Sequence, residues 1–316
     1  MHNKASINMN KLYLHSPTFD YFIAPLNLES RDFKLFIRYM NAFSGTLIFR
    51  TSSNLIYFMD DDLIDLYALK EMPFKYKLRI LRKTFLLKTM IFLFKPKIWV
   101  SNQYLFHKYL HLSPKILRPI ASQSLLDRRW LHTNTAFIDK RIRIIYHGSW
   151  SHKNEIQWLV PIIREVQYRC TNTIFEIIGG DRVAKLFKSI PRVNVLDTMP
   201  WPQYLEHTSN IHQDIGLAPL MDTLFNRGRG PIKFFDYARA GAVGIYSKGP
   251  AFSDFVADGV DGFLLDNDPQ LWVEKIVEMV NNPELCQSMA DKAWEKVLDN
   301  SPASQSVQDY LNGFQT

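Results

Sequence analysis

Short apolar runs and longer amphipathic segments alternate along the second half of the chain. Buried strands are predicted at the apolar runs 143–146, 173–178, 193–196, 215–220, 242–246 and 262–265. Helices are predicted between and after them, at residues 156–168, 204–209, 251–257, 271–280, 284–298 and 304–314. Strands separated by helices of this length predict an α/β fold with a parallel, doubly wound sheet. Ligand groups of such a sheet gather at the carboxyl ends of its strands.

The first half predicts a smaller set of elements. Residues 11–14 and 45–49 are expected strands, and residues 30–43 have helical spacing. The apolar strand at residues 55–59 ends in three consecutive carboxylates: Asp60, Asp61 and Asp62. These carboxylates fit three roles: ligand groups at a strand end, the cap and first turn of a helix, or a divalent cation site.

These patterns predict three parts of the chain. Residues 1–135 form an N-terminal domain, and residues 136–300 form a C-terminal domain. The polar stretch at residues 121–140 links the two. Residues 301–316 are expected to form a terminal helix that packs back toward the first domain.

Residues 70–97 combine bases with aromatic and aliphatic side chains. They hold nine lysines and arginines but one acid, Glu71. A basic, aromatic-rich helix favours docking on an anionic membrane surface. The alternative is a core helix whose lysines extend to water. No recognised nucleic-acid-binding signature is present, so no nucleic-acid partner is expected.

Composition and charge limit the partners and the compartment that we expect for the protein. The net charge of +7 favours anionic partners. Cys170 and Cys286 lie far apart, which gives neither a disulfide framework nor a cysteine-based metal site and fits a reducing compartment. The first ten residues are polar and do not resemble a signal peptide. No run reaches ~18 apolar residues, so no transmembrane helix is expected. We therefore expect a cytoplasmic protein, peripheral on the inner face of the membrane.

The stretch from Asn226 to Ser247 carries the clearest candidate chemistry. Arg229 lies between two glycines, in a loop that suits close approach to an anion. Pro231 and Gly241 mark the beginning and end of a short predicted helix. Lys233 and Asp236 are three residues apart and share a face of that helix.

These residues resemble a known family. Ile215-Gly-Leu-Ala-Pro-Leu, followed by Asn226, Arg229 and Pro231-Ile-Lys-Phe-Phe-Asp, is similar to the nucleotide-sugar-binding domain of GT-B glycosyltransferases. The likeness is strongest to the retaining glycosyltransferase family 4, the glycosyl transferases group 1. Gly148-Ser149 with His152 and Glu155 resembles the family's first phosphate loop, and residues 258–265 resemble its glycine-punctuated strand. The resemblance covers about residues 143–300.

The resemblance implies a GT-B fold, with two Rossmann-like doubly wound domains facing across a cleft and a reduced N-terminal domain. It implies sugar transfer from a nucleoside-diphosphate sugar to a glycan or lipid-linked acceptor, with retention, in bacterial surface polysaccharide or glycolipid assembly. No metal or other cofactor is obligatory. The implied donor-site residues are Gly148 and Ser149 for phosphate approach, Gly179, Gly180, Met199 and Trp201 around the base, Arg229 and Lys233 on the diphosphate, Asp236 on the ribose, and Asn226. The implied catalytic candidates are Asp60, Asp61, Asp62 and His152.

Two alternatives remain open. Gly228 stands where the family commonly has its first glutamate, which suits a catalytically inactive GT-B partner protein. A metal-dependent transferase that uses Asp60 to Asp62 is the other.

Overall fold

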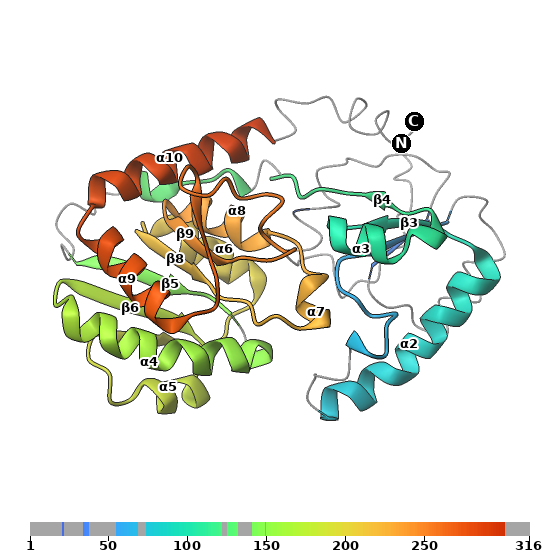
Figure 1. The fold of residues 1–316 in the computed structure, drawn as a ribbon, viewed down its shortest axis with the longest axis horizontal. Coiled ribbons are helices and arrows are strands. Elements are labelled where there is room, and N and C mark those ends of the chain that lie inside the picture. The colour runs from blue at the N-terminus through green and yellow to red at the C-terminus, as the bar shows by residue number, and fades with distance from the viewer. Residues whose placement is uncertain are drawn as a thin grey trace, which may run out of the picture. The chain divides into compact units, whose positions relative to one another are not determined.

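A computed structural model describes residues 21, 34–37, 55–68, 74–121, 125–131, 141–148 and 150–300 (Figure 1). The chain divides into two compact units. Unit 1 comprises Met1–Ser122, Asp222–Gly230 and Gln305–Thr316, and unit 2 comprises Gln123–Met221 and Pro231–Ser304. The segment 222–230 thus belongs to unit 1, although the sequence on both sides of it belongs to unit 2.

Unit 2 is built on a six-stranded sheet in the order β10-β9-β8-β5-β6-β7, in which every pair is parallel. The strands are β5 (Ile142–Tyr146), β6 (Thr173–Ile178), β7 (Val193–Leu196), β8 (Ile215–Ala218), β9 (Val243–Ser247) and β10 (Gly262–Leu265). All four residues of β8 are buried, as expected for a parallel strand covered on both faces.

Helices connect and cover this sheet. They are α4 (Lys153–Arg169), α5 (Asp181–Phe187), α6 (Trp201–Asn210), α8 (Ile232–Ala240), α9 (Pro269–Val280) and α10 (Pro283–Asp299). Helix α4 packs against α9, while α8 packs against α6 and α10. The chain runs from β5 outward through β6 to β7, and then returns to lay β8, β9 and β10 on the other side of β5. Right-handed crossovers in opposite directions place α4 and α5 on one face of the sheet and α6 and α8 on the other.

Helix α8 is fixed by local chemistry at both ends. Pro231, predicted as the first helical residue, is instead the N-cap that precedes Ile232, and Gly241 ends the helix with a φ of 84°. Only glycine adopts that left-handed conformation without strain. Close packing seats the helix on β8, since a Cβ added to Gly216 would lie 2.4 Å from the ring of Tyr237.

Among its described residues, unit 1 contains a four-stranded parallel sheet in the order β1-β2-β3-β4. Its strands are β1 (Lys34–Ile37), β2 (Leu55–Met59), β3 (Lys97–Val100) and β4 (Lys115–Ile116), and its helices are α2 (Phe74–Phe94), α3 (Gln103–Lys108) and α7 (Leu224–Arg227). The core of this unit gathers Tyr57, Met59, Val100 and Leu105, and it takes in Phe225 of α7. A buried aromatic side chain therefore anchors the segment 222–230 in unit 1.

The predicted α/β class with parallel sheets is confirmed, but some elements differ. Residues 34–37 form strand β1 rather than part of a helix, because their backbone pairs with β2 in a parallel ladder. Residues 251–255 form successive turns, and no helix forms over the predicted range 251–257. The strands expected at 11–14 and 45–49 and the helix expected at 304–314 lie outside the described residues.

Candidate functional site

The carboxyl edge of the unit 2 sheet has a topological switch point between β5 and β8. The chain leaves β5 in one direction and β8 in the other, so their following loops diverge. Divergent loops leave a crevice outside the strand ends, which is where open α/β sheets bind ligands. Helix α8 follows β8 and begins at this edge, which brings the amino end of a helix to the same place.

Lys233 lies in the first turn of α8 and reaches the end of β5. Its Nζ atom lies 5.9 Å from the ring centre of Tyr146 and 5.8 Å from that of Tyr237. Burial lowers the pKa of the adjacent His147, and the charge of Lys233 lowers it further. A half-buried ammonium group beside a helix amino end favours an anion at the carboxyl ends of β5 and β8.

Three glycines lie at this edge of the sheet, where the backbone packs closely against side chains or turns sharply. A Cβ added to Gly148 would lie 2.7 Å from the hydroxyl of Tyr146, so a side chain there would displace a buried ring. Gly180 has a φ of 64° and caps α5, while a Cβ on Gly179 would lie 2.1 Å from Val183. The tight turn from β6 to α5 therefore explains why glycine occupies both positions. Ser149 lies outside the described residues.

Asp236 faces protein groups in this structure. The residue is 5% exposed, and its Oδ1 lies 3.8 Å from Nη2 of the buried Arg239. Burial raises the pKa of Tyr204 well above its ordinary value, and the charge of Asp236 adds to the shift. Asp236 therefore belongs to a buried polar group with Tyr204 and Arg239, and its ribose contact stays a prediction.

The other predicted residues of unit 2 lie in the connections. His152 ends the 3₁₀ turn Trp150–His152, with its Nδ1 3.8 Å from Oε2 of Glu155. Glu155 Oε1 in turn accepts a hydrogen bond from the backbone N–H of Met221, at 3.2 Å. Trp201 begins α6 and stacks on Tyr204, with ring centres 5.3 Å apart. Met199 is half-buried just before α6.

Three side chains of unit 2 meet in a cluster that the sequence interpretation missed. His147 Nε2 lies 3.3 Å from Glu176 Oε1, and His207 Nε2 lies 3.0 Å from the same oxygen. Burial tends to raise the pKa of Glu176, but hydrogen bonds from the two histidines outweigh it and lower the pKa. No local motif could reveal the cluster, because its members come from a loop, a strand and a helix.

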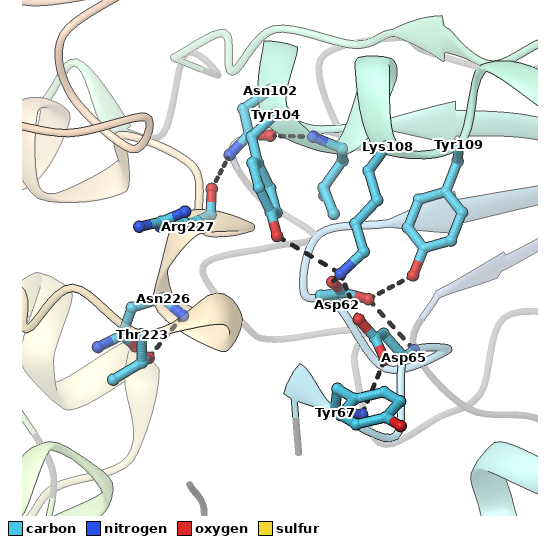
Figure 2. A network of polar contacts seen from close by, with 11 residues as sticks. Asp62, Asp65, Tyr67, Asn102, Tyr104, Lys108, Tyr109, Thr223, Asn226 and Arg227 are labelled. Atoms are coloured by element: carbon cyan, nitrogen blue, oxygen red, sulfur yellow. Dashed lines mark hydrogen bonds and ion pairs between the residues drawn. The ribbon is translucent and has the colours of Figure 1, made fainter. Parts of the chain in front are cut away.

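In unit 1, Asp62 is the centre of a polar network (Figure 2). Its side chain is fully buried, with Oδ2 2.6 Å from Lys108 Nζ and Oδ1 2.5 Å from the hydroxyl of Tyr109. Burial opposes the charge of Lys108, but hydrogen bonds to Asp62 and Asp65 outweigh it and raise the lysine pKa. An ammonium group thus occupies the position beside Asp62 that a metal cation would need.

The three consecutive carboxylates do not begin a helix. Residues 60–67 form bends and turns, and Asp62 Oδ1 accepts the backbone N–H of Asp65 at 3.3 Å. Asp60 and Asp61 are buried as well. The helix-cap interpretation is therefore wrong. The observed contacts of Asp62 tie the end of β2 to α3.

The end of β3 holds the glycine/arginine loop. Asn102 Nδ2 donates to the carbonyl oxygens of Arg227 and Arg229, each at 2.9 Å, and Figure 2 shows the bond to Arg227. Arg229 Nε donates to Oδ1 of Asn226 at 3.3 Å, and its guanidinium carbon lies 5.2 Å from the ring centre of Phe225. Asn226 and Arg229 thus belong to unit 1, whereas Lys233 and Asp236 belong to unit 2.

Comparisons with known proteins place this architecture in a class. Several solved structures share the fold at low sequence identity. TarM of S. aureus is 14% identical with a TM-score of 0.62, over 90% of this chain and 55% of that chain. WaaG, a glycosyltransferase involved in lipopolysaccharide biosynthesis, is 13% identical with a TM-score of 0.61, over 84% and 77%. HepE of Anabaena is 11% identical with a TM-score of 0.58, over 89% and 77%.

The fold is that of the GT-B glycosyltransferases, as predicted. Residues 141–282 match the family model "Glycosyl transferases group 1", which confirms the resemblance for this segment. The chain spans little more than half of the length of the TarM chain. The curated proteins include no match to the sequence.

Proposed function

We propose that this protein is a glycosyltransferase that moves a sugar from a nucleoside-diphosphate sugar to an acceptor hydroxyl, with retention at the anomeric carbon. The observation that carries the proposal is Lys233, in the first turn of α8 and beside Tyr146 at the end of β5. It lies at the switch point of the sheet, inside the segment that matches the family. A diphosphate leaving group needs positive charge there, and a lysine with a helix amino end supplies it.

Uridine diphosphate is the donor fragment best suited as a probe. HepE was crystallised with UDP and glucose, and a TarM mutant with UDP. In the proposed complex, Lys233 pairs with the diphosphate and Gly148 lets it approach the backbone. His152 and the Met199–Trp201 turn are assigned to the sugar and base ends of the donor.

The test of the donor site is calorimetric titration of the full chain with UDP. Lys233→Ala is expected to weaken binding by about 10- to 100-fold, since a charge-assisted hydrogen bond contributes about 1.5–3 kcal/mol. Lys292→Ala removes an exposed lysine of α10 and is expected to leave the affinity unchanged. Equal UDP affinity in the Lys233 variant and the parent would overturn the phosphate assignment.

Transfer itself is tested with a panel of nucleotide sugars and with glycan and lipid-linked acceptors. Product formation with an unchanged anomeric configuration, read by NMR, supports a retaining transferase. UDP binding without transfer to any acceptor favours the alternative of a catalytically inactive partner protein. That alternative rests on Gly228, which stands in place of the family's first glutamate. Full activity in chelator would contradict a metal-dependent transferase at Asp60 to Asp62.

We also propose that unit 1 docks on an anionic membrane through α2, which suits a lipid-linked acceptor of surface polysaccharide or glycolipid assembly. Helix α2 exposes Leu78, Leu81, Phe85 and Phe92 at spacings of three, four and seven residues, and these spacings place them on one face. Lys88 lies on the same face and is exposed, and Lys95 and Lys97 are exposed just beyond the helix. Apolar side chains with flanking lysines match the interface of an anionic bilayer.

The proposed docking is a contact with the membrane surface. Among the helices that the structure describes, none is long and apolar enough to cross a membrane. Phe85 and Phe92 are the expected anchors, because these residues are 75% and 78% exposed.

A further inference from the structure

The cluster of His147, Glu176 and His207 brings three donor atoms to one point. Each side chain offers one nitrogen or oxygen, and these atoms all lie within 4.8 Å of one another. They come from the loop after β5, from β6 and from α6, so the cluster ties three elements of unit 2. The proposed sugar transfer uses none of the three.

The spacing of these atoms suits a zinc ion. Ligands at about 2.0–2.2 Å in tetrahedral geometry lie about 3.3–3.6 Å from each other. The two distances to Glu176 Oε1 are 3.3 Å from His147 Nε2 and 3.0 Å from His207 Nε2. Two imidazoles with one carboxylate form a donor set that suits zinc and related transition metals better than magnesium or calcium, which prefer oxygen alone.

Outer contacts orient two of the three side chains. The second nitrogen of His147, Nδ1, lies 3.3 Å from the hydroxyl of Tyr204. The second oxygen of Glu176, Oε2, accepts a hydrogen bond from Nδ2 of Asn194 at 3.2 Å. Such partners fix the ring and carboxylate orientation of metal ligands and are a regular part of metal sites.

We propose that His147, Glu176 and His207 bind one divalent transition-metal ion, with Zn²⁺ preferred. Side-chain exposure is 19% at His207 against 1% at His147 and 4% at Glu176, so the ion enters from the His207 side. A water molecule there completes the coordination. The ion stabilises the junction of β5, β6 and α6, and the proposal is independent of the proposed sugar transfer.

The experiment uses the full chain without a histidine tag, stripped with chelator and titrated with Co²⁺ as a spectroscopic probe. The expected result is one Co²⁺ per chain with the visible absorption of a four-coordinate site, displaced by Zn²⁺. His207→Gln and Glu176→Gln are each expected to weaken binding by at least about 10-fold, the loss typical even of outer contacts. His107→Gln changes an exposed histidine of α3 and is expected to have no effect.

Far-UV circular dichroism checks that each variant is folded, and His207, on the exposed side of the cluster, is the substitution least costly to the core. Absence of the Co²⁺ spectrum at micromolar metal would overturn the proposal and leave the cluster as a hydrogen-bonded group. Equal metal affinity in the parent and in folded His207→Gln protein would also overturn it, because the metal then binds elsewhere.

Discussion

The side chain of Asn102 holds the backbone of Arg229, a residue 127 positions further along the chain. Asn102 Nδ2 donates to the carbonyl oxygen of Arg229 at 2.9 Å, and its Oδ1 accepts the N–H of Leu105, which caps α3. Nearby, Ser101 Oγ donates to the carbonyl oxygen of Gly228 at 3.3 Å. The end of β3 therefore fixes the loop that leads, four residues later, to Lys233.

Asn102→Asp separates the two tasks of this side chain. Aspartate still accepts the N–H of Leu105, but it cannot donate to the carbonyl oxygens of Arg227 and Arg229. We expect hydrogen exchange of residues 222–230 to accelerate, with a loss of about 1–3 kcal/mol in local stability, while α3 stays protected.

Asn102→Ala provides the comparison, because alanine removes the cap as well. Exchange in α3 is expected to accelerate only in this variant, since a lost cap costs about 1 kcal/mol. Unchanged exchange of residues 222–230 in Asn102→Asp would show that Phe225 and Ser101 hold the loop without Asn102.

The pair of Lys108 and Asp65 predicts a dependence of stability on acid. Burial raises the pKa of Asp65, but the hydrogen bond and charge of Lys108, 2.5 Å away, outweigh it and lower the pKa. The unfolded chain binds the proton first, near pH 3.9. The contribution of Asp65 is therefore complete above that pH and is lost as the pH falls through the lower folded-state pKa.

Asp65→Asn is expected to reduce the fall in urea midpoint between about pH 5 and pH 2, because asparagine does not titrate in this range. Asp254→Asn changes an exposed carboxylate of unit 2 and serves as the control. A pH profile of the Asp65 variant parallel to that of the parent would contradict the coupling to Lys108.

Two glycines with the same backbone preference predict different costs. Gly241 and Gly259 have φ angles of 84° and 73°. A Cβ on Gly241 would lie 2.6 Å from His212 and 2.7 Å from Trp130, whereas a Cβ on Gly259 would meet nothing within 4 Å. Gly259→Ala is expected to cost about 1–2 kcal/mol for the left-handed backbone alone.

Gly241→Ala adds the displacement of two packed rings, about 1–3 kcal/mol more. Urea unfolding of both variants measures the difference, and Trp130 fluorescence is expected to change only in Gly241→Ala. Equal losses would show that the rings at Gly241 move aside freely.

Elements marked by local sequence signals could be predicted, whereas elements that depend on contacts between distant segments could not. Pro231 and Gly241 punctuate α8 in the sequence itself, so the helix and the position of Lys233 in its first turn could be predicted. Residues 34–37 show helical spacing but form β1, because pairing with β2 is a contact between distant segments. Pattern along a short window contains no information about that partner.

The candidate site follows the same division. The glycine turns and Lys233 can be recognised from residue type and order along the sequence. The sequence around Asp62 does not predict that Lys108 and Tyr109 bond to its oxygens, since both partners come from the end of α3, more than 40 residues away. Likewise, no window contains His147, Glu176 and His207 together.

Membrane docking of α2 depends on its exposed aromatic side chains. Phe85→Ser with Phe92→Ser removes two exposed anchors, and neither ring is part of the core of unit 1. Each buried phenylalanine contributes about 1.5–3 kcal/mol, so the double variant is expected to bind anionic vesicles at least 10-fold more weakly. The assay is co-sedimentation with phosphatidylglycerol vesicles, with pure phosphatidylcholine as the uncharged comparison.

Tyr168→Ser is the matched control, because Tyr168 is an equally exposed aromatic residue, 82% exposed, on α4 of unit 2. It is expected to leave vesicle binding unchanged. Raised salt is expected to weaken binding of the parent, since the lysines of α2 act through screened charge. Equal binding to charged and uncharged vesicles, or an equal loss in Tyr168→Ser, would remove α2 as the docking surface while leaving the donor site at Lys233 intact.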